Sequence, residues 1–137
     1  MLVMKRAAYD TMLSYACACT GEMACGILGG RQEAGRRIAT QCCPLPNAAH
    51  SRERFALERS AHSRAVSELN AQRLAPVGTW FCHRDSGASM TAYEIQSAHD
   101  RDGSYLVLSL NDPERPELRS YRVWGGRADP EQLVIED

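Results

Sequence analysis

The alternation of hydrophobic and polar residues along the chain predicts both helices and strands. Apolar residues at positions 2–4 predict a short first strand, and positions 6–19 then repeat apolar residues at helical spacing. Gly21 is expected to end that helix. A second helix is predicted over positions 60–74, where alanine and leucine recur near helical spacing opposite many charges. A third, short helix is predicted over positions 91–99.

Short apolar or alternating runs predict the strands of a sheet. They lie at positions 23–28 followed by Gly29-Gly30, 37–43, 78–83, 105–110, 118–124 and, as a last edge strand, 133–135. A turn at Asn111-Asp112-Pro113 makes the strand at 118–124 antiparallel to its predecessor, and residues 44–58 form a polar connection. Because helices and strands alternate and no repeat or linker divides the chain, the sequence predicts one α/β (α+β) domain over residues 1–137.

Length and charge narrow the class of protein. With 137 residues the chain can bury a core without disulfides or metal to hold it. The net charge of -1 gives no electrostatic reason to expect a nucleic acid or a membrane surface as partner. No apolar run approaches the roughly 20 residues that span a bilayer. The first residues place apolar side chains before the charges, which is the wrong order for a signal peptide, so we expect a cytoplasmic protein.

Cysteine is frequent for a chain of this length. The six cysteines are Cys17, Cys19, Cys25, Cys42, Cys43 and Cys82. In a cytoplasmic protein they are expected to stay reduced, and none of their spacings matches a structural zinc pair. The interpretation we favour is that they are small buried hydrophobes and inert surface thiols. A thiol-based role in redox chemistry or sulfur transfer stays open as the alternative.

The segment from Gly78 to His83 has the spacing of a metal site without all of its ligands. A strand places residues 81 and 83 on one face, where a pair of histidines would hold a metal ion, yet position 81 is phenylalanine. Downstream, Thr91 and Glu94 have the spacing of a helix capping box, which gives both residues a structural reason to be there. The remaining histidines lie outside this segment, and we expect none of them to bind metal. They are His50, His62 and His99.

Several segments together resemble a known family, the JAMM metallopeptidases, also called MPN, JAB or Mov34. The matching segments are Cys25 to Gly30, Pro46 to Ala49, Gly78 to Glu94, Tyr105 to Ser109 and, through Asp112-Pro113, Glu117 to Arg122. The resemblance extends over nearly the whole chain and implies a mixed β-sheet flanked by helices. The chain looks most like the small prokaryotic branch. Enzymes of that branch hydrolyse the bond between the C-terminus of a ubiquitin-like sulfur-carrier protein and an attached amino acid or peptide.

The resemblance implies a zinc site and shows where this chain departs from it. The second histidine of the family motif corresponds to His83, and the aspartate position corresponds to Glu94, one methylene longer. The serine that helps to stabilise the oxyanion corresponds to Thr91, which keeps a hydroxyl. The first histidine position is Phe81, which cannot bind zinc. Cys82 lies between the two positions, but strand alternation points it to the other face unless a bulge turns it.

The general base implied by the resemblance is also displaced. Counting back from Gly26, the base position is Met23, and Glu22 is one residue too early. In a regular strand that shift sends the carboxylate to the opposite face, so Glu22 can act only if a local bulge restores it. The candidate catalytic residues are therefore Glu22 and Thr91, and the candidate metal ligands are His83 and Glu94. Zinc is the implied cofactor only if this site is functional.

Three functions stay open at this point. We favour a JAMM-like domain that is catalytically impaired or inactive, a protein-binding module for the tail of a ubiquitin-like or sulfur-carrier protein. The first alternative is an active but divergent zinc isopeptidase, in which Cys82 or a residue of a partner chain supplies another ligand. The second is thiol-dependent sulfur handling by Cys82 or Cys25, with His83 lowering the pKa of the thiol. A homo- or hetero-oligomer is compatible with all three.

Overall fold

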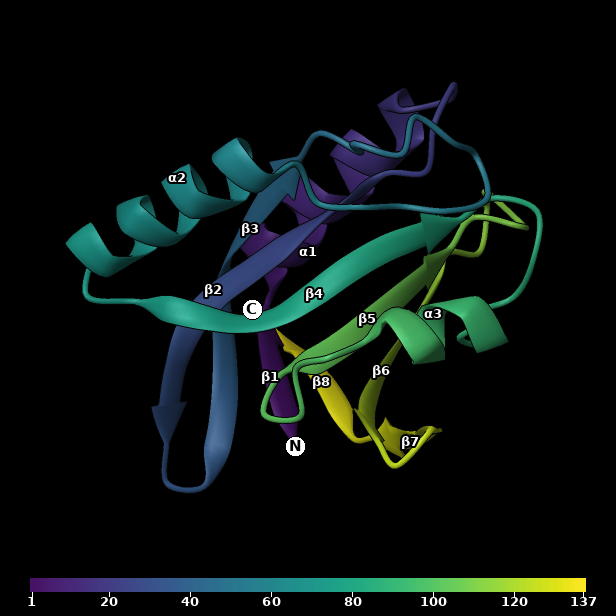
Figure 1. Cartoon of the computed structure of the whole chain (residues 1–137). Coiled ribbons are helices and arrows are strands. Elements are labelled where there is room, and N and C mark those ends of the chain that lie inside the picture. Colours follow the sequence, from purple (N-terminus) through teal and green to yellow (C-terminus); the bar gives the residue numbers. More distant parts are fainter.

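The computed structural model describes all 137 residues and contains eight strands and three helices. In chain order the elements are β1 (Leu2–Lys5), α1 (Arg6–Ala18), β2 (Cys25–Glu33), β3 (Arg36–Leu45), α2 (Arg59–Ala71), β4 (Ala75–His83), α3 (Ala92–Ser97), β5 (Ser104–Ser109), β6 (Glu117–Trp124), β7 (Arg127–Glu131) and β8 (Leu133–Glu136). The strands form one sheet in the order β7-β6-β5-β4-β2-β3-β1-β8 (Figure 1).

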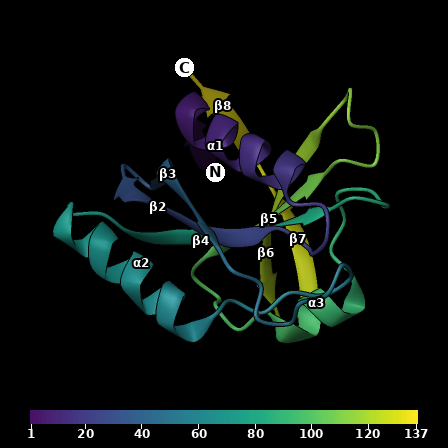
Figure 2. The same ribbon diagram turned by 90° about the horizontal axis from the view of Figure 1, so that it is seen from above.

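The sheet is mixed, and helices cover both of its faces. β1 runs parallel to β3 and β8, and β4 runs parallel to β5, whereas the other pairs are antiparallel. Figure 2 shows α1 on one side of the sheet and α2 and α3 on the other. The predicted fold class, a mixed sheet flanked by helices, is confirmed. No helix combines the length and the apolar character that a membrane-spanning segment requires.

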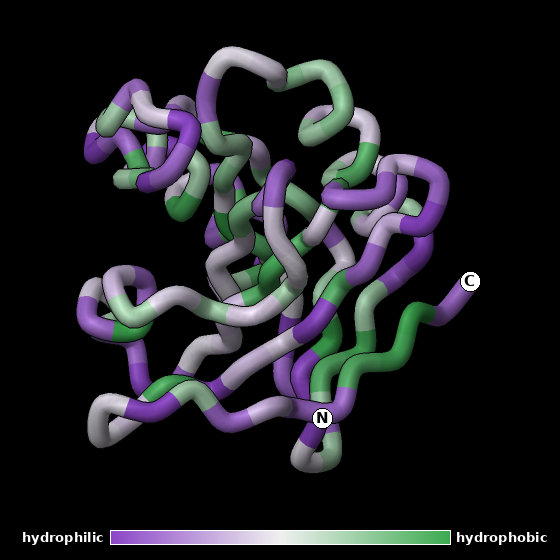
Figure 3. Tube along the Cα trace, turned by 90° about the vertical axis from the view of Figure 1, so that its right-hand side faces the viewer, coloured by the Kyte–Doolittle hydropathy of each residue, from purple (hydrophilic) through white to green (hydrophobic).

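Helix α1 is positioned by the apolar stripe that its sequence predicts. Ala8, Met12 and Ala16 recur every four residues, and all three are buried in one cluster with Trp80 and Leu106. The small alanines let the helix lie close to the sheet, while Met12 fills the space between the strands. Figure 3 shows hydrophobic segments concentrated in the interior strands and hydrophilic ones in the loops. This cluster is the larger part of the core.

Helix α2 packs on the opposite face and explains one glycine. Leu69 and Ala65 of α2 form a small cluster with Ile27 of β2. A Cβ atom added to Gly29 would lie 2.2 Å from Leu69 Cδ2, well inside van der Waals contact. Glycine at position 29 therefore lets the helix approach the strand, and the register of β2 shifts at this point. The sequence predicts that the strand ends at Gly29-Gly30. In the structure β2 instead continues to Glu33.

Strand β3 also runs further than predicted, through Pro44 to Leu45. Proline lacks the N–H that a central strand must donate, so its presence indicates a free edge. The pairing agrees, because β1 pairs with β3 only at residues 37–39 and the rest of β3 has β2 as its single neighbour. Pro44 lies opposite Gly26 on that one paired side. At Pro44, β3 has no strand on its other side, so the missing N–H of proline breaks no hydrogen bond to a second neighbouring strand.

The sequence gives no sign of strand β7. Its residues, Arg127–Glu131, include aspartate and proline, which are depleted in strands. β7 is an edge strand that pairs only with β6. Trp124 lies opposite Arg127, and Tyr121 lies opposite Pro130. Edge pairing tolerates the proline. The predicted edge strand near the C-terminus is confirmed as β8.

The two ends of the sheet meet. β7 and β8 stand at opposite ends of the strand order, yet Gln132 alone separates them in the chain. The carbonyl of Gln132 accepts a hydrogen bond of 2.9 Å from the backbone N–H of Leu2. One extended segment therefore pairs first with β6 and then with β1, which curls the sheet around the face that α1 covers.

A buried carboxylate stabilises this closure. Glu131 accepts hydrogen bonds from the guanidinium of Arg37 (2.6 Å), from Ser104 Oγ (2.5 Å) and from Ser120 Oγ (2.9 Å). The side chains of Glu131 and Arg37 are 4% and 6% exposed. Burial alone would raise the pKa of Glu131, but the hydrogen bonds from the two serines and the charge of Arg37 outweigh it, so the pKa is lowered. The carboxylate thus joins β7 to β3, β5 and β6.

We predict that Glu131→Ala lowers the free energy of unfolding by about 3–5 kcal/mol, because it leaves the buried Arg37 guanidinium without its carboxylate partner. Urea denaturation monitored by circular dichroism measures this. Glu136→Ala is the control, since Glu136 pairs with Lys5 at the surface and its loss should have a much smaller effect. Equal losses in the two variants would contradict the importance of the closure.

We also predict that acid destabilises the protein through Glu131. A carboxylate whose pKa is lower in the folded than in the unfolded state stabilises the fold above the unfolded pKa, here about 4.5. That stabilisation is lost as the pH falls below 4.5 through the lowered pKa. Glu131→Gln cannot titrate, so the gap in unfolding free energy between wild type and variant should narrow between pH 6 and pH 3 (about 3 pH units). A constant gap would show that Glu131 does not carry the effect.

Candidate functional site

The candidate site lies where the end of β4 meets helix α3. Strand alternation directs Thr79, Phe81 and His83 to the face covered by α2 and α3. Cys82 points to the other face, where it belongs to the cluster around Trp80 and α1. No bulge turns Cys82 toward His83, because the register shift of β4 lies on the far side of Gly78.

His83 and Glu94 are in direct contact. His83 Nε2 lies 2.8 Å from Glu94 Oε2, and His83 Nδ1 lies 2.9 Å from the carbonyl oxygen of Gly87. Both side chains are almost completely buried. A carbonyl only accepts, so Nδ1 carries a hydrogen, and the second hydrogen bond requires one further proton shared by imidazole and carboxylate. Both ring nitrogens of His83 are therefore engaged.

The surroundings favour the cationic form of this imidazole. Burial lowers the pKa of His83. The hydrogen bonds to Glu94 and to the Gly87 carbonyl together raise it by more, so the pKa lies above the ordinary value. The negative charge of Glu94 acts in the same direction. The contact with Glu94 thus favours protonation of His83.

Thr91 and Glu94 form the capping box that the sequence predicts. Thr91 Oγ1 accepts from the backbone N–H of Glu94 at 3.2 Å, and Glu94 Oε1 accepts from the backbone N–H of Thr91 at 2.8 Å. The two carboxylate oxygens of Glu94 therefore have different partners, one on α3 and one on β4. The hydroxyl of Thr91 is occupied by the helix cap.

Apolar side chains fill the positions of the missing ligand and base. Phe81 is fully buried, and its ring stacks on that of Phe55 with 4.7 Å between the centroids and 23° between the planes. Met23 is buried in the same cluster. Phe81 thus fills this volume as an apolar core residue does. The stacking partner, Phe55, lies in a loop and has no sequence signal that would mark it.

Glu22 lies away from the pair of His83 and Glu94. Its carboxylate contacts His50 Nδ1 at 2.9 Å in a largely exposed pair. Strand β2 begins only at Cys25, and its one irregularity is at Gly29, so no bulge in this strand redirects Glu22. The structure thus brings together three candidate residues, His83, Thr91 and Glu94, and leaves the fourth outside.

The loop between β3 and α2 is held over the site by an asparagine. The two N–H groups of the Asn47 side-chain amide are shared among the carbonyls of Met23, Ser51 and Arg54. Its oxygen accepts from the backbone N–H groups of Ala49 and Ala56. These five bonds satisfy the buried side chain and fix the loop that carries Phe55. The sequence marks Asn47 only through the family resemblance.

A contact between Arg54 and Tyr93 joins this loop to α3. The guanidinium carbon of Arg54 lies 4.2 Å from the centre of the Tyr93 ring, a cation–π geometry. On the other side of the site, Tyr121 Oη donates to the carbonyl of Ala88, and Ser109 Oγ donates to that of Ser86, both at 2.6 Å. The segment between β4 and α3 is thus fixed at three points, counting His83. Sequence reasoning missed these anchors because each joins residues far apart in the chain.

The residues around His83 do not fit a zinc ion. No group of three or more histidine, cysteine, aspartate or glutamate side chains is placed to hold a metal. The two candidate ligands face each other at hydrogen-bond distance, and Phe81 and Phe55 occupy the adjoining volume. Zinc in proteins requires three or four ligands around an accessible position. In this arrangement the site offers two, and both are already satisfied.

The buried cysteines near the site are poor thiolates. Burial raises the pKa of Cys82 to about 11 and that of Cys25 to about 12. His83 is not among the groups that shift either value. At neutral pH both thiols therefore stay protonated and weakly nucleophilic.

A groove adjoins the site between the Phe55 loop and α3. Its volume is about 540 Å³. The floor comes from β2, β4 and β5, and the walls come from the loop, α2 and α3. Lining residues include Ile27, Phe55, Leu57, Thr79, Tyr93 and Tyr105, with His62, His99 and Asp100 at the ends. The exposed surface of the groove is mainly apolar.

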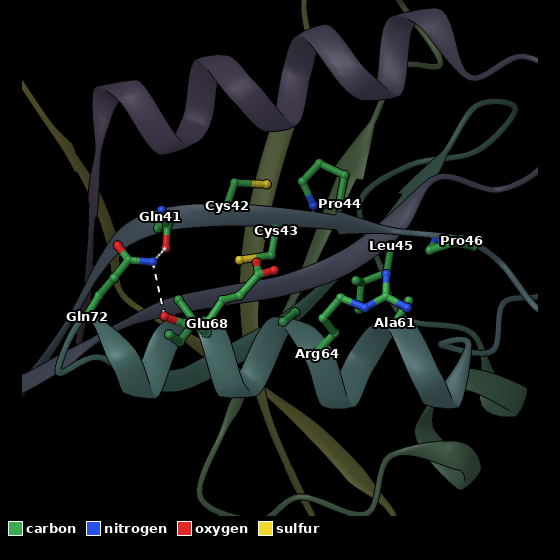
Figure 4. Close-up of a pocket in the computed structure, with 12 residues that line it drawn as sticks. Gln41, Cys42, Cys43, Pro44, Leu45, Pro46, Ala61, Arg64, Glu68 and Gln72 are labelled. Carbon is green, nitrogen blue, oxygen red and sulfur yellow. Dashed lines mark hydrogen bonds between the residues drawn. The ribbon is translucent and has the colours of Figure 1, made fainter.

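A separate hollow of about 440 Å³ lies between β3 and α2, away from this site. Figure 4 shows Cys43 directed into it and Cys42 directed toward α1. Gln72 bridges one end by donating to Gln41 Oε1 at 3.3 Å. The hollow contains none of the candidate site residues.

Curated proteins similar to this chain match it over almost its whole length. The CysO-cysteine peptidase of Mycobacterium tuberculosis is 26% identical over 135 residues, which cover 98% of this chain and 91% of that protein. The peptidase of the same name from Mycobacterium bovis matches equally. The resemblance to the JAMM/MPN family is confirmed. No protein-family model matches the chain.

Solved structures support the JAMM/MPN fold directly. A Desulfitobacterium hafniense protein with a solution structure superposes with a TM-score of 0.93 at 26% identity, covering 100% of this chain and 94% of that one. A JAB1/MPN domain protein from Archaeoglobus fulgidus has a TM-score of 0.62 at 13% identity, covering 98% of both chains. The second likeness shows the fold alone. Both likenesses extend over almost the whole of this chain and support the fold described above.

We predict that Phe55→Ala lowers the free energy of unfolding by about 2–4 kcal/mol, because it removes the ring stacked on Phe81 and uncovers that core residue. Glu22→Gln, at the exposed edge of the same region, should change it by less than about 0.5 kcal/mol. Thermal and urea denaturation of both variants measures the difference. A loss for Phe55→Ala as small as that for Glu22→Gln would mean that the loop does not close the site.

Proposed function

We propose that this JAMM/MPN-like domain, residues 1–137, is a catalytically impaired or inactive module that binds the C-terminal tail of a sulfur-carrier or ubiquitin-like protein. The observation that carries the proposal is the groove beside a site whose ligand and base positions are apolar. An isopeptidase needs a metal-activated water and a general base at that point. Phe81 and Met23 supply neither.

The shape and chemistry of the groove support a tail as ligand. Its floor carries Ile27, Thr79 and Tyr105, which offer apolar contact with few charges. Strand β4 already pairs with β2 and β5, so a bound tail cannot add to it as a further strand. Recognition would therefore rest on side-chain contacts with the walls, where Tyr93 is 43% exposed.

The first alternative is a divergent zinc peptidase, favoured by the likeness to proteins named CysO-cysteine peptidase. It requires His83 and Glu94 to separate and a third ligand to join them. Cys82 is a poor candidate because it faces α1. The second alternative, thiol chemistry, is opposed by the raised pKa values of Cys82 and Cys25.

We predict that Tyr93→Ala weakens tail binding about tenfold, since it removes an aromatic wall of the groove. The probe is a synthetic peptide with the C-terminal sequence of a sulfur-carrier protein, and isothermal titration calorimetry measures its dissociation constant. Tyr15→Ala is the matched control, because Tyr15 is a similarly exposed tyrosine on α1, on the opposite face. Equal affinity in both variants would place binding elsewhere.

The same peptide joined to cysteine tests catalysis. We expect the purified protein to release no cysteine from it, with or without added zinc, as followed by mass spectrometry. Release that depends on zinc and disappears in His83→Ala would instead establish the first alternative. Release that is insensitive to zinc and lost on alkylation of the thiols would establish the second.

A further inference from the structure

The length of the Glu94 side chain decides what this carboxylate can do. One oxygen accepts from the N-terminus of α3, and the other reaches His83 Nε2 at 2.8 Å. A side chain one methylene shorter would leave a gap of about 1.5 Å on one side, because a carbon–carbon bond is about that long. Glutamate therefore spans from helix to strand with no intermediary.

Helix α3 depends on this contact. With six residues it is far too short to be stable by itself. It belongs to no strand ladder, and its polar anchors are the capping box, the Glu94–His83 bond and the contact of Tyr93 with Arg54. Since α3 carries Tyr93, the bond to His83 also fixes one wall of the groove.

Phe81 and Glu94 act together. A metal ion between an imidazole and a carboxylate would need a further ligand from the position of Phe81. A ring there supplies none and, stacked on Phe55, fills the volume that water or a metal would occupy. With that volume filled, the imidazole and carboxylate avoid a burial penalty only by bonding to each other.

We propose that the direct Glu94–His83 hydrogen bond replaces a metal ion as the crosslink between β4 and α3, so that the chain folds and shapes its groove without metal. The part that concerns the groove rests on the proposed tail-binding function. The part that concerns metal and folding does not.

Two substitutions at position 94 test the crosslink. Their expected outcomes are reversed if His83 and Glu94 bind a metal ion instead of each other. Glu94→Gln keeps the length, and its amide can donate to a neutral imidazole while its oxygen accepts from Thr91. We expect its melting temperature to stay within about 3 °C of wild type. The melting temperature of Glu94→Asp should fall by roughly 10 °C, since its shorter side chain cannot bond to both His83 and the backbone N–H of Thr91. If His83 and Glu94 were metal ligands, Asp would be the better-tolerated residue and Gln the worse.

Thr91→Ala separates the crosslink from the helix cap. It removes the hydroxyl that caps α3 but leaves both partners of the buried pair intact. We expect a decrease of only about 3–5 °C, as for the loss of one cap. A decrease for Glu94→Asp no larger than that for Thr91→Ala would overturn the proposal. Amide hydrogen exchange across residues 92–97 should be accelerated in Glu94→Asp and unchanged in Glu94→Gln.

Metal analysis of the wild-type protein completes the test. Protein purified in zinc-containing buffer and then desalted should contain well under one equivalent of zinc, and added zinc should leave its melting temperature unchanged. Stoichiometric zinc that is lost in His83→Ala would overturn the proposal. These measurements involve no tail peptide. Failure of peptide binding with the expected stability and metal results would therefore count against the proposed function alone.

Discussion

Closure of the curled sheet is the constraint on which the rest of the structure depends. A single extended segment must pair with β6 through β7 and with β1 through β8, although these strands lie at opposite ends of the sheet. Glu131 lies at the junction, where its burial is tolerated only because Arg37 and two serines meet it. The strands are thereby held in one curvature. That curvature encloses the α1 face and leaves the other face open to α2, α3 and the candidate site.

On that second face, the candidate site combines one polar pair with apolar neighbours. The end of β4 and the start of α3 still bring an imidazole and a carboxylate together. The neighbouring positions, however, belong to a continuous apolar cluster that reaches from Met23 through Phe81 to Tyr121. Beside this cluster, His83 and Glu94 are buried as a pair that bond to each other. Different residues therefore specify the fold and the site, because a fold depends on many side chains and a function on a few.

How far the sequence predicts this outcome depends on the range of each interaction. The capping box of Thr91 and Glu94 is local, so its spacing predicts it, and strand alternation correctly separates Cys82 from His83. The contact of Glu94 with His83 is different. The resemblance implies a shared metal, and only the structure shows that the longer side chain reaches His83 directly.

Longer-range features had no signal in the hydrophobic pattern of the sequence. Glu131 and Arg37 are 94 residues apart, and nothing in the composition of β7 marks it as a strand. Phe55 and Asn47 lie in a loop whose polar character conceals a buried anchor. Hydrophobic periodicity predicts which residues of an element face the core. It does not predict which loop will close over that core.

The unpaired part of β3 has a consequence for behaviour at high concentration. An exposed strand edge is a template for pairing with other chains and thus for aggregation. Here the edge beyond β1 carries Pro44, and Pro46 follows directly. Each removes one hydrogen-bond donor, so an incoming strand cannot form a regular ladder. The same prolines that appear in the sequence as breaks in a pattern therefore protect the folded protein against growth into fibrils.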